Sequence, residues 1–141
     1  MGSAKSNSVH VCQLVSLPKI YNPAGNITPL NGGLDVPFDI NRIYYLYDVP
    51  GGESRGGHGH KELEQYLVAA SGSFDVVLFD GNERKRVNLN RPYQALHIVP
   101  GIWRELENFS SGSICLVLAS HRYDEADYIR DYEAFKQFKH G

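Results

Sequence analysis

The chain has 141 residues, of which 42% are hydrophobic and 21% are charged, and its formal net charge is −2. Such a composition is typical of one globular domain with a substantial core, and the lack of net positive charge argues against a nucleic-acid partner. Two cysteines do not make a disulfide framework, and no apolar run approaches the roughly 18 residues of a membrane-spanning helix. We therefore expect a cytoplasmic protein with neither nucleic-acid nor membrane partners.

Residues 1–8 are small and polar and are expected to be a disordered lead-in, which leaves 9–141 as a single domain. From there, turn signals such as Asp80-Gly81 separate short runs rich in β-branched and aromatic residues. Many short strands at such spacing indicate a β-sandwich or barrel. The expected strands cover 9–15, 26–30, 42–49, 64–69, 74–79, 86–89, 95–99, 103–108 and 114–119, and the histidine-containing segment 52–60 is also interpreted as a strand.

The character of the chain changes at its end. In residues 124–138 the apolar positions recur near helical spacing, acidic residues come first and lysines come last, as the helix dipole favours. This pattern predicts one C-terminal helix with its first turn near Asp124. The expected architecture is therefore all-β with a short terminal helix.

His58 and His60 are two residues apart in a predicted strand. Because side chains alternate between the two faces of a strand, both imidazoles should face the same pocket. They could bind a metal, carry protons for a substrate, or be structural residues hydrogen-bonded inside the barrel.

The surrounding residues resemble the first motif of the cupin superfamily, in which a carboxylate and a third histidine complete a metal site. In this chain the carboxylate position holds Gln65 and the last ligand position holds Arg104. An arginine has no lone pair to give to a metal, and two histidines alone make a poor site. We therefore expect no metal, unless a register shift brings Glu62 or Glu64 inward.

Four segments carry a closer resemblance, to the cupin-type nucleotide-sugar 3,4-ketoisomerases that act on dTDP-4-keto-6-deoxyglucose. In the segment 55–61, Gly59 stands where alanine is usual in the family, and the segment 118–130 ends in Tyr-Asp-Glu-Ala-Asp-Tyr-Ile-Arg. The resemblance extends over nearly the whole chain and implies a cupin jelly-roll barrel. The four segments are 37–45, 55–61, 99–105 and 118–130.

Such an enzyme moves the sugar ketone from C4 to C3 through an enediol(ate), which requires proton carriers and hydrogen-bond donors but no cofactor. The resemblance implies His60 as the base and His58 as a second proton carrier. Tyr45 is expected to donate a hydrogen bond to the enediolate, with Tyr44 as the alternative if the register differs. Gln65 is counted among the substrate-binding residues.

Arginines suit the diphosphate of the substrate, since the guanidinium binds phosphate oxygens bidentately. Arg55 and Arg42 are the candidates, and Trp103 could pack either on the thymine or in the core. Arg104 should reach the sugar, where it favours the gluco product, although Ala24 stands at a companion position where tyrosine or arginine is expected.

Two other functions remain open. A cupin sugar-nucleotide 3,5-epimerase normally pairs its histidine with an aspartate, and no such pair is recognisable in the sequence. A non-catalytic sugar-nucleotide-binding cupin would use the same pocket without turnover. The resemblance also implies a homodimer with swapped strands, and a role in deoxyamino-sugar biosynthesis for a glycan such as the O-antigen of lipopolysaccharide.

Overall fold

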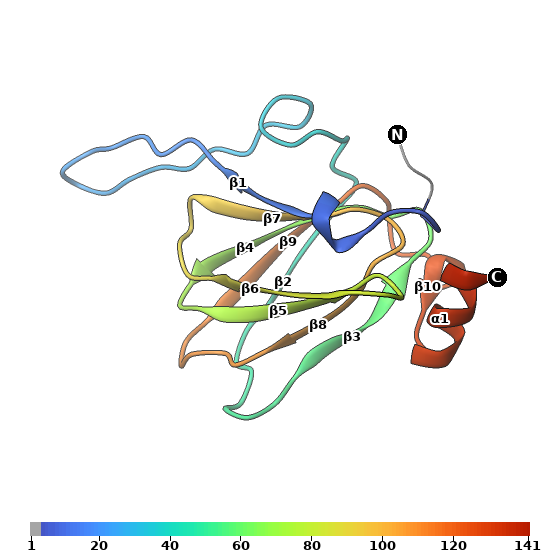
Figure 1. Ribbon diagram of the computed structural model, residues 1–141. Coiled ribbons are helices and arrows are strands. Elements are labelled where there is room, and N and C mark those ends of the chain that lie inside the picture. The colour runs from blue at the N-terminus through green and yellow to red at the C-terminus, as the bar shows by residue number, and fades with distance from the viewer. Residues whose placement is uncertain (1–3) are drawn as a thin grey trace.

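The computed structural model describes residues 4–141 as two antiparallel five-stranded sheets packed face to face (Figure 1). The strand orders are β1-β7-β4-β9-β2 and β10-β3-β8-β5-β6. The predicted all-β jelly-roll barrel with a short C-terminal helix is thus confirmed. The elements are η1 (Val9–Val11), β1 (Gln13–Ser16), β2 (Arg42–Leu46), β3 (Arg55–His60), β4 (Gln65–Ser71), β5 (Phe74–Phe79), β6 (Arg84–Leu89), β7 (Gln94–Ile98), β8 (Trp103–Glu107), β9 (Ile114–Ala119), η2 (Glu125–Asp127), β10 (Tyr128–Ile129) and α1 (Tyr132–His140).

The main core lies between the sheets and is built mostly from aliphatic side chains at alternate strand positions, together with Phe74 and Phe109. In β4, for example, Leu67 and Ala69 join this core, whereas Tyr66 and Val68 face the other side of the sheet. That outer side is also buried, because residues 30–40 pack across it with Val36 at the centre. The sheet that supplies β4 and β9 is therefore covered on both faces and forms a firm wall for the interior.

An arm of residues 18–27 leaves the body of the protein after β1 and returns (Figure 1), and every residue in it is exposed. The strand expected over 26–30 is not present; the only pairing in the arm is an isolated bridge between Ile20 and Ile27. No strand within residues 4–141 covers the apolar side chains of this segment. Ile20, Tyr21 and Ile27 are more than half exposed.

The expected disordered lead-in differs from the structure at residues 4–8, while residues 1–3 lie outside the described part of the chain. Lys139 in α1 donates hydrogen bonds from Nζ to the carbonyl oxygens of Ala4, Asn7 and Gly101, at 2.7–2.8 Å. Asn7 also donates to the carbonyl of Pro100 at 3.0 Å. Residues 4–8 are therefore tied to the β7–β8 turn and to the C-terminal helix.

The C-terminal helix begins later than the sequence pattern predicted. Tyr128 and Ile129 pair with His60 and Gly59 as a short strand at the edge of the second sheet. The helix proper starts after Asp131, whose carboxylate accepts a hydrogen bond from the Ala134 amide at 2.8 Å and caps α1. Within residues 4–141, no helix is long and apolar enough to cross a membrane.

Candidate active site

The two histidines meet Gln65 and Arg104 in the interior of the barrel. His58 of β3 is paired directly with Arg104 of β8. Together with Gln65 and Tyr44 they line a cavity of about 460 Å³, a size suited to a small-molecule ligand. The remaining lining residues are Arg42, Leu46, Arg55, Gly56, Gly57, Leu67, Leu106, Val117, Tyr128 and Arg130.

Arg104 is the largest fully buried side chain, with 1% of its surface exposed. Its Nη1 donates to Gln65 Oε1 at 2.5 Å and its Nη2 donates to the Ile102 carbonyl at 3.1 Å. Burial lowers the pKa of Arg104 to about 10, which still leaves the guanidinium charged at neutral pH. The floor of the cavity therefore carries a fixed, desolvated positive charge.

Gln65 connects that charge to Tyr44. Its side-chain amide donates from Nε2 to the Tyr44 hydroxyl at 3.2 Å. Burial raises the pKa of Tyr44, while the hydrogen bond from Gln65 and the charge of Arg104 act in the opposite direction. Tyr44 is accordingly a neutral phenol at physiological pH and can act as a hydrogen-bond donor.

His58 lies on the cavity wall with its Nε2 buried and without a hydrogen-bond partner among residues 4–141. Burial, followed by the charge of Arg104, lowers the pKa of His58 to about 3. The imidazole is therefore neutral in the free protein. A neutral imidazole has a lone pair with which it can accept a proton.

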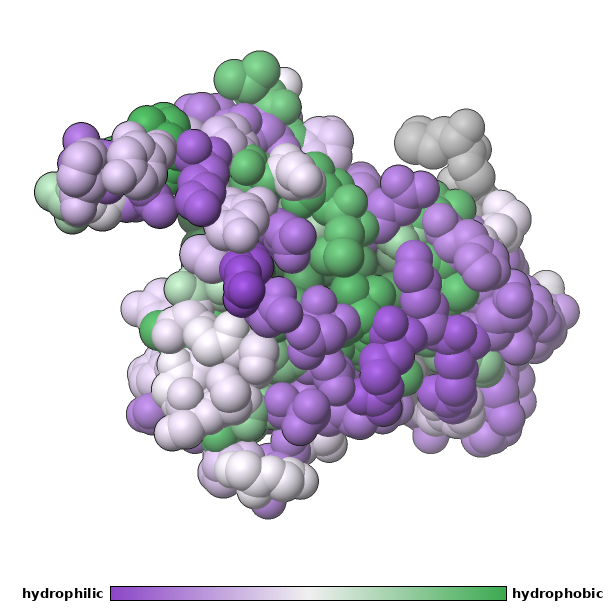
Figure 2. Space-filling view, turned by 60° about the vertical axis from the view of Figure 1, so that its left-hand side comes forward, coloured by the Kyte–Doolittle hydropathy of each residue, from purple (hydrophilic) through white to green (hydrophobic). Residues whose placement is uncertain are grey.

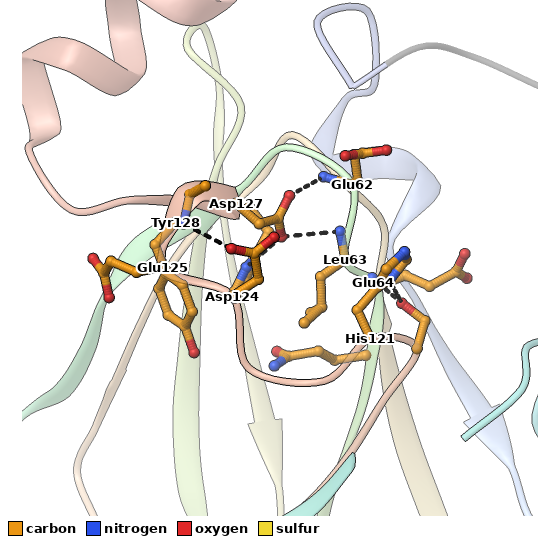
Figure 3. Close-up of polar contacts among 12 residues, drawn as sticks. Glu62, Leu63, Glu64, His121, Asp124, Glu125, Asp127 and Tyr128 are labelled. Atoms are coloured by element: carbon orange, nitrogen blue, oxygen red, sulfur yellow. Dashed lines mark hydrogen bonds and ion pairs between the residues drawn. The ribbon is translucent and has the colours of Figure 1, made fainter. Parts of the chain in front are cut away.

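His60 is completely buried beside His58, and the two ring centroids are 4.9 Å apart. Its Nδ1 lies 3.0 Å from Oδ2 of Asp127. The Asp127 carboxylate also accepts the backbone N–H groups of Glu62 at 2.7 Å and Leu63 at 3.2 Å (Figure 3). A carboxylate can only accept, so Nδ1 of His60 carries the hydrogen and Nε2 keeps the lone pair.

Burial and then Arg104 lower the pKa of His60 far below its usual range, so this second imidazole is neutral as well. Like that of His58, its Nε2 is buried and has no partner within the described residues. The site thus holds two neutral bases side by side. The tautomer of one of them is fixed by a carboxylate.

Tyr128 and Arg130 belong to the site although the sequence analysis assigned them no role. The Tyr128 ring packs against both histidines, with centroid distances of 5.0 Å to His58 and 4.4 Å to His60. Arg130 lies over the Tyr128 ring at 4.1 Å and forms a bidentate ion pair with Glu125. The Asp-Tyr-Ile-Arg sequence at 127–130 could have identified them, but it was interpreted as part of the predicted C-terminal helix.

Arginines gather around the cavity. Arg42, Arg55 and Arg130 line it with Arg104, and Arg42 donates to the Tyr128 hydroxyl at 3.3 Å. The one acidic group paired with these arginines in the described residues is Glu125, on Arg130. The lining is therefore strongly positive, which favours an anionic ligand.

Comparison with known proteins identifies the family. The family model "FdtA: WxcM-like, C-terminal" matches residues 10–140. The TDP-4-oxo-6-deoxy-alpha-D-glucose-3,4-oxoisomerase of Aneurinibacillus thermoaerophilus is 41% identical over 126 residues, which are 89% of this chain and 91% of that protein. The chain belongs to this family of sugar 3,4-ketoisomerases.

Two solved structures support the same assignment. A 3,4-ketoisomerase from Helicobacter canadensis is 42% identical, with a TM-score of 0.90 over 92% of this chain and 98% of that chain. A variant of the 3,4-ketoisomerase QdtA from Thermoanaerobacterium thermosaccharolyticum, in complex with TDP-4-keto-6-deoxyglucose, is 40% identical, with a TM-score of 0.88 over 89% and 91% of the two chains. The protein is accordingly an isomerase with the cupin fold of these relatives.

The structure of this ketoisomerase corrects two of the expected site residues. Tyr45 points away from the cavity and is 59% exposed, because side chains in β2 alternate and Arg42, Tyr44 and Leu46 take the inner face. Tyr44, the register alternative, is the tyrosine in the site. Trp103 packs in the core beneath α1 with Phe79, Ile129 and Phe135, so it does not line the cavity.

The cavity is lined by His58, Gln65, Arg42, Arg55 and Arg104, and His60 lies next to it beside His58. Glu64 faces the opposite side of the sheet, where it pairs with His97 at 2.8 Å, and Glu62 is exposed. No group of three or more His, Cys, Asp or Glu side chains within residues 4–141 could hold a metal ion. The sequence analysis recognised no His–Asp pair, and this was wrong, because His60 and Asp127 form such a pair in the structure.

Proposed function

We propose that this ketoisomerase converts TDP-4-keto-6-deoxyglucose into a TDP-3-keto-6-deoxyhexose, for deoxyamino-sugar biosynthesis, by moving a proton from C3 to C4 through an enediol(ate). The observation that carries the proposal is the pairing of neutral His58 with the buried cation Arg104 across β3 and β8. A base and a fixed positive charge on one wall can remove a proton and stabilise the oxyanion that results. The named relatives at about 40% identity act on or bind this sugar nucleotide.

We assign removal of the C3 proton to His58 and delivery of a proton to C4 to His60, which reverses the roles implied by the family resemblance. His58 passes the proton that it has taken to the lone pair on Nε2 of the neighbouring His60, and the O3 hydroxyl proton moves to O4, so both imidazoles end neutral. His58 lines the cavity, whereas His60 lies next to it and is held by Asp127. The QdtA variant that holds TDP-4-keto-6-deoxyglucose has a histidine replaced by asparagine, and another variant has an arginine replaced by histidine. The same number of residues separates those two positions as separates His58 from Arg104, which supports the equivalence of His58 with the mutated histidine.

The diphosphate of the substrate is assigned to the arginines at the cavity mouth, Arg55, Arg42 and Arg130. Two phosphate groups can each accept charge-assisted hydrogen bonds from a guanidinium. Arg130 donates from Nε and Nη2 to Glu125, so the donors that remain for phosphate are the two hydrogens on Nη1 and the second hydrogen on Nη2. QdtA has also been crystallised with TDP, which supports nucleotide binding in this family.

We propose the gluco configuration at C4 of the product. A TDP-quinovose 3,4-ketoisomerase from Campylobacter jejuni is 44% identical to this chain, and the TDP-fucose-3,4-ketoisomerase of the same species is 31% identical. The QdtA double variant has an arginine changed to histidine and a tyrosine changed to arginine. With the same offset in numbering, the changed arginine corresponds to Arg104, and the changed tyrosine corresponds to Ala24. Arg104 therefore carries this part of the proposal alone.

We also propose a homodimer that exchanges the arm. The arm, residues 18–27, stands out from the body as the projection at upper left in Figure 2, with apolar residues on its surface. At the edge of the first sheet lies a second exposed apolar surface, formed by Ile43 and Tyr45 of β2 and by Tyr47 just after it. Light scattering at micromolar concentration should give twice the mass of the chain, and a monomer would contradict this proposal.

A second candidate function is a sugar-nucleotide 3,5-epimerase, because the His60–Asp127 pair with Tyr128 alongside has the components of such a site. One experiment separates the two. The protein is incubated with TDP-4-keto-6-deoxyglucose, and the product is analysed by NMR for the position of the ketone and the configuration at C4. A 3-keto gluco sugar supports the proposal, whereas a 4-keto sugar inverted at C3 or C5 supports the epimerase.

A further inference from the structure

The buried hydrogen bonds from Arg104 through Gln65 to Tyr44 run in one fixed direction. A side-chain amide can usually be turned either way, but a guanidinium can only donate. Because Arg104 Nη1 lies 2.5 Å from the Gln65 side chain, the atom facing it must be the amide oxygen. The amide nitrogen therefore faces Tyr44 and donates to its hydroxyl oxygen at 3.2 Å.

The direction of these bonds determines what Tyr44 can do. Its hydroxyl oxygen accepts from Gln65, so its single hydrogen has to point elsewhere. Arg42, whose guanidinium lies over the ring at 4.5 Å, cannot accept a hydrogen bond. The nearby Tyr128 hydroxyl accepts from Arg42 and makes no hydrogen bond with Tyr44. No side chain of residues 4–141 accepts from Tyr44, which lines the cavity; the hydrogen is free for a ligand there.

We infer that Gln65 is a positioning residue, which keeps the Tyr44 hydroxyl as a hydrogen-bond donor toward the sugar oxygen that becomes negative when the C3 proton leaves. This inference rests on the proposed ketoisomerase reaction. Arg104 polarises the amide of Gln65 at one end, and the amide in turn makes Tyr44 a better donor at the other. Both bonds are shielded from solvent, since Gln65 is 2% exposed and Arg104 is 1% exposed.

The inference explains why an amide occupies a position at which a carboxylate would have almost the same shape. A glutamate would accept from Arg104 and would also accept the hydrogen of Tyr44. The tyrosine would then turn its hydrogen away from the cavity and present only lone pairs to the developing oxyanion. The change from an amide to a carboxylate thus reverses one hydrogen bond and also adds a negative charge beside Arg104, within nearly unchanged packing.

The test is a double-mutant cycle of Gln65→Glu and Tyr44→Phe, with kcat and KM measured for TDP-4-keto-6-deoxyglucose. Loss of one donor to an oxyanion typically lowers kcat by about 100-fold or more, and we expect this loss for each single variant. Gln65→Glu also adds a charge beside Arg104, so Gln65→Met, which adds none, is measured in the same cycle. Because Gln65 acts through Tyr44, the double variant of Gln65→Met and Tyr44→Phe should be no slower than Tyr44→Phe alone. KM and the affinity for TDP should change by less than about 3-fold in all of these variants.

A multiplicative loss in the double variant, or a Gln65→Glu variant with wild-type kcat, would overturn the inference. TDP binding and thermal unfolding report whether each variant is folded; if Gln65→Glu does not fold, the cycle with Gln65→Met alone decides. Met is close in volume and makes neither hydrogen bond, so it should also cost kcat only when Tyr44 is present. A wild-type protein without turnover would instead contradict the proposed function, which keeps the two failures distinct.

Discussion

His60 Nδ1 lies 3.0 Å from Oδ2 of Asp127, and the same carboxylate receives two backbone amides from the turn between β3 and β4. The aspartate reaches this position from η2, more than sixty residues further along the chain, because β10 pairs with β3 directly after it. The contact orients the ring and fixes which nitrogen bears the hydrogen. The sheet edge thereby supplies a neutral base of defined tautomer beside His58, next to the cavity.

Asp127→Asn should lower kcat by about 100-fold or more with little change in the affinity for TDP. The asparagine amide would donate to Nδ1 of His60, so the hydrogen would move to Nε2 and the lone pair would be lost from the side of the reaction. Steady-state kinetics and TDP titration measure the two effects.

Asp124→Asn is the matched control for that variant. Asp124 caps η2 by accepting from the Ala126 amide at 3.1 Å, but it makes no contact with His60. Its replacement should leave kcat within about 3-fold of wild type. Equal losses in both variants would mean that the segment is merely loosened and that the tautomer of His60 does not matter.

The value of kcat/KM should not fall as the pH is lowered from 8 to 5. Since burial lowers the pKa of His58 in the free protein to about 3, its imidazole stays neutral and able to accept a proton from pH 8 down to pH 5. The pH dependence of kcat/KM reports ionisations of the free enzyme. We expect kcat/KM to be flat over this interval; an acidic limb with a midpoint near 6.5 would contradict the desolvated environment assigned to His58.

The stability of the fold should fall as the pH drops below about 6.5. Burial lowers the pKa of His60 in the folded state, whereas the unfolded chain protonates it near 6.5, so acid favours the unfolded state. One such histidine contributes a slope of up to about 1.4 kcal/mol per pH unit. Urea unfolding between pH 7.5 and 4.5 should show a shallower slope for His60→Asn than for the wild type, and an equal slope would contradict this assignment.

Gly59→Ala should destabilise the protein by about 1–3 kcal/mol through overpacking. A Cβ at this position would lie 2.9 Å from the Phe135 ring and 3.3 Å from the Ile102 carbonyl oxygen. Gly57→Ala is the control, because its Cβ would make an ordinary contact of 3.8 Å with Trp103. Urea unfolding measures both; Phe135→Leu should restore part of the loss in Gly59→Ala, and a Gly59→Ala variant as stable as wild type would mean that α1 is free to shift.

Much of the fold followed from local patterns. Strands such as β5 and β9 are apolar runs between clear turn signals, and the sequence analysis predicted their bounds. The two-residue period correctly brought His58 and His60 to one side. The choice between Tyr44 and Tyr45 could not be made in this way, because both are aromatic and only the register with β9 decides which faces inward.

The C-terminal segment shows why the rest could not be predicted. Its apolar spacing matches a helix, yet Tyr128 and Ile129 form a strand because β3 offers an unpaired edge there. Tertiary pairing overrode the local preference and brought Asp127, Tyr128 and Arg130 to the site. Trp103 presents the same limit, since only the packing of Phe135 in α1 reveals that it belongs to the core.

The central claim, that His58 removes the C3 proton and His60 delivers the proton at C4, is tested most directly by NMR in D₂O. Wild-type protein, His58→Asn and His60→Asn are each incubated with TDP-4-keto-6-deoxyglucose, and deuterium is followed at C3 and C4. We expect 3-keto product with the wild type, no deuterium at C3 with His58→Asn, and exchange at C3 without 3-keto product with His60→Asn. Exchange at C3 that persists in His58→Asn at the wild-type rate would contradict the account.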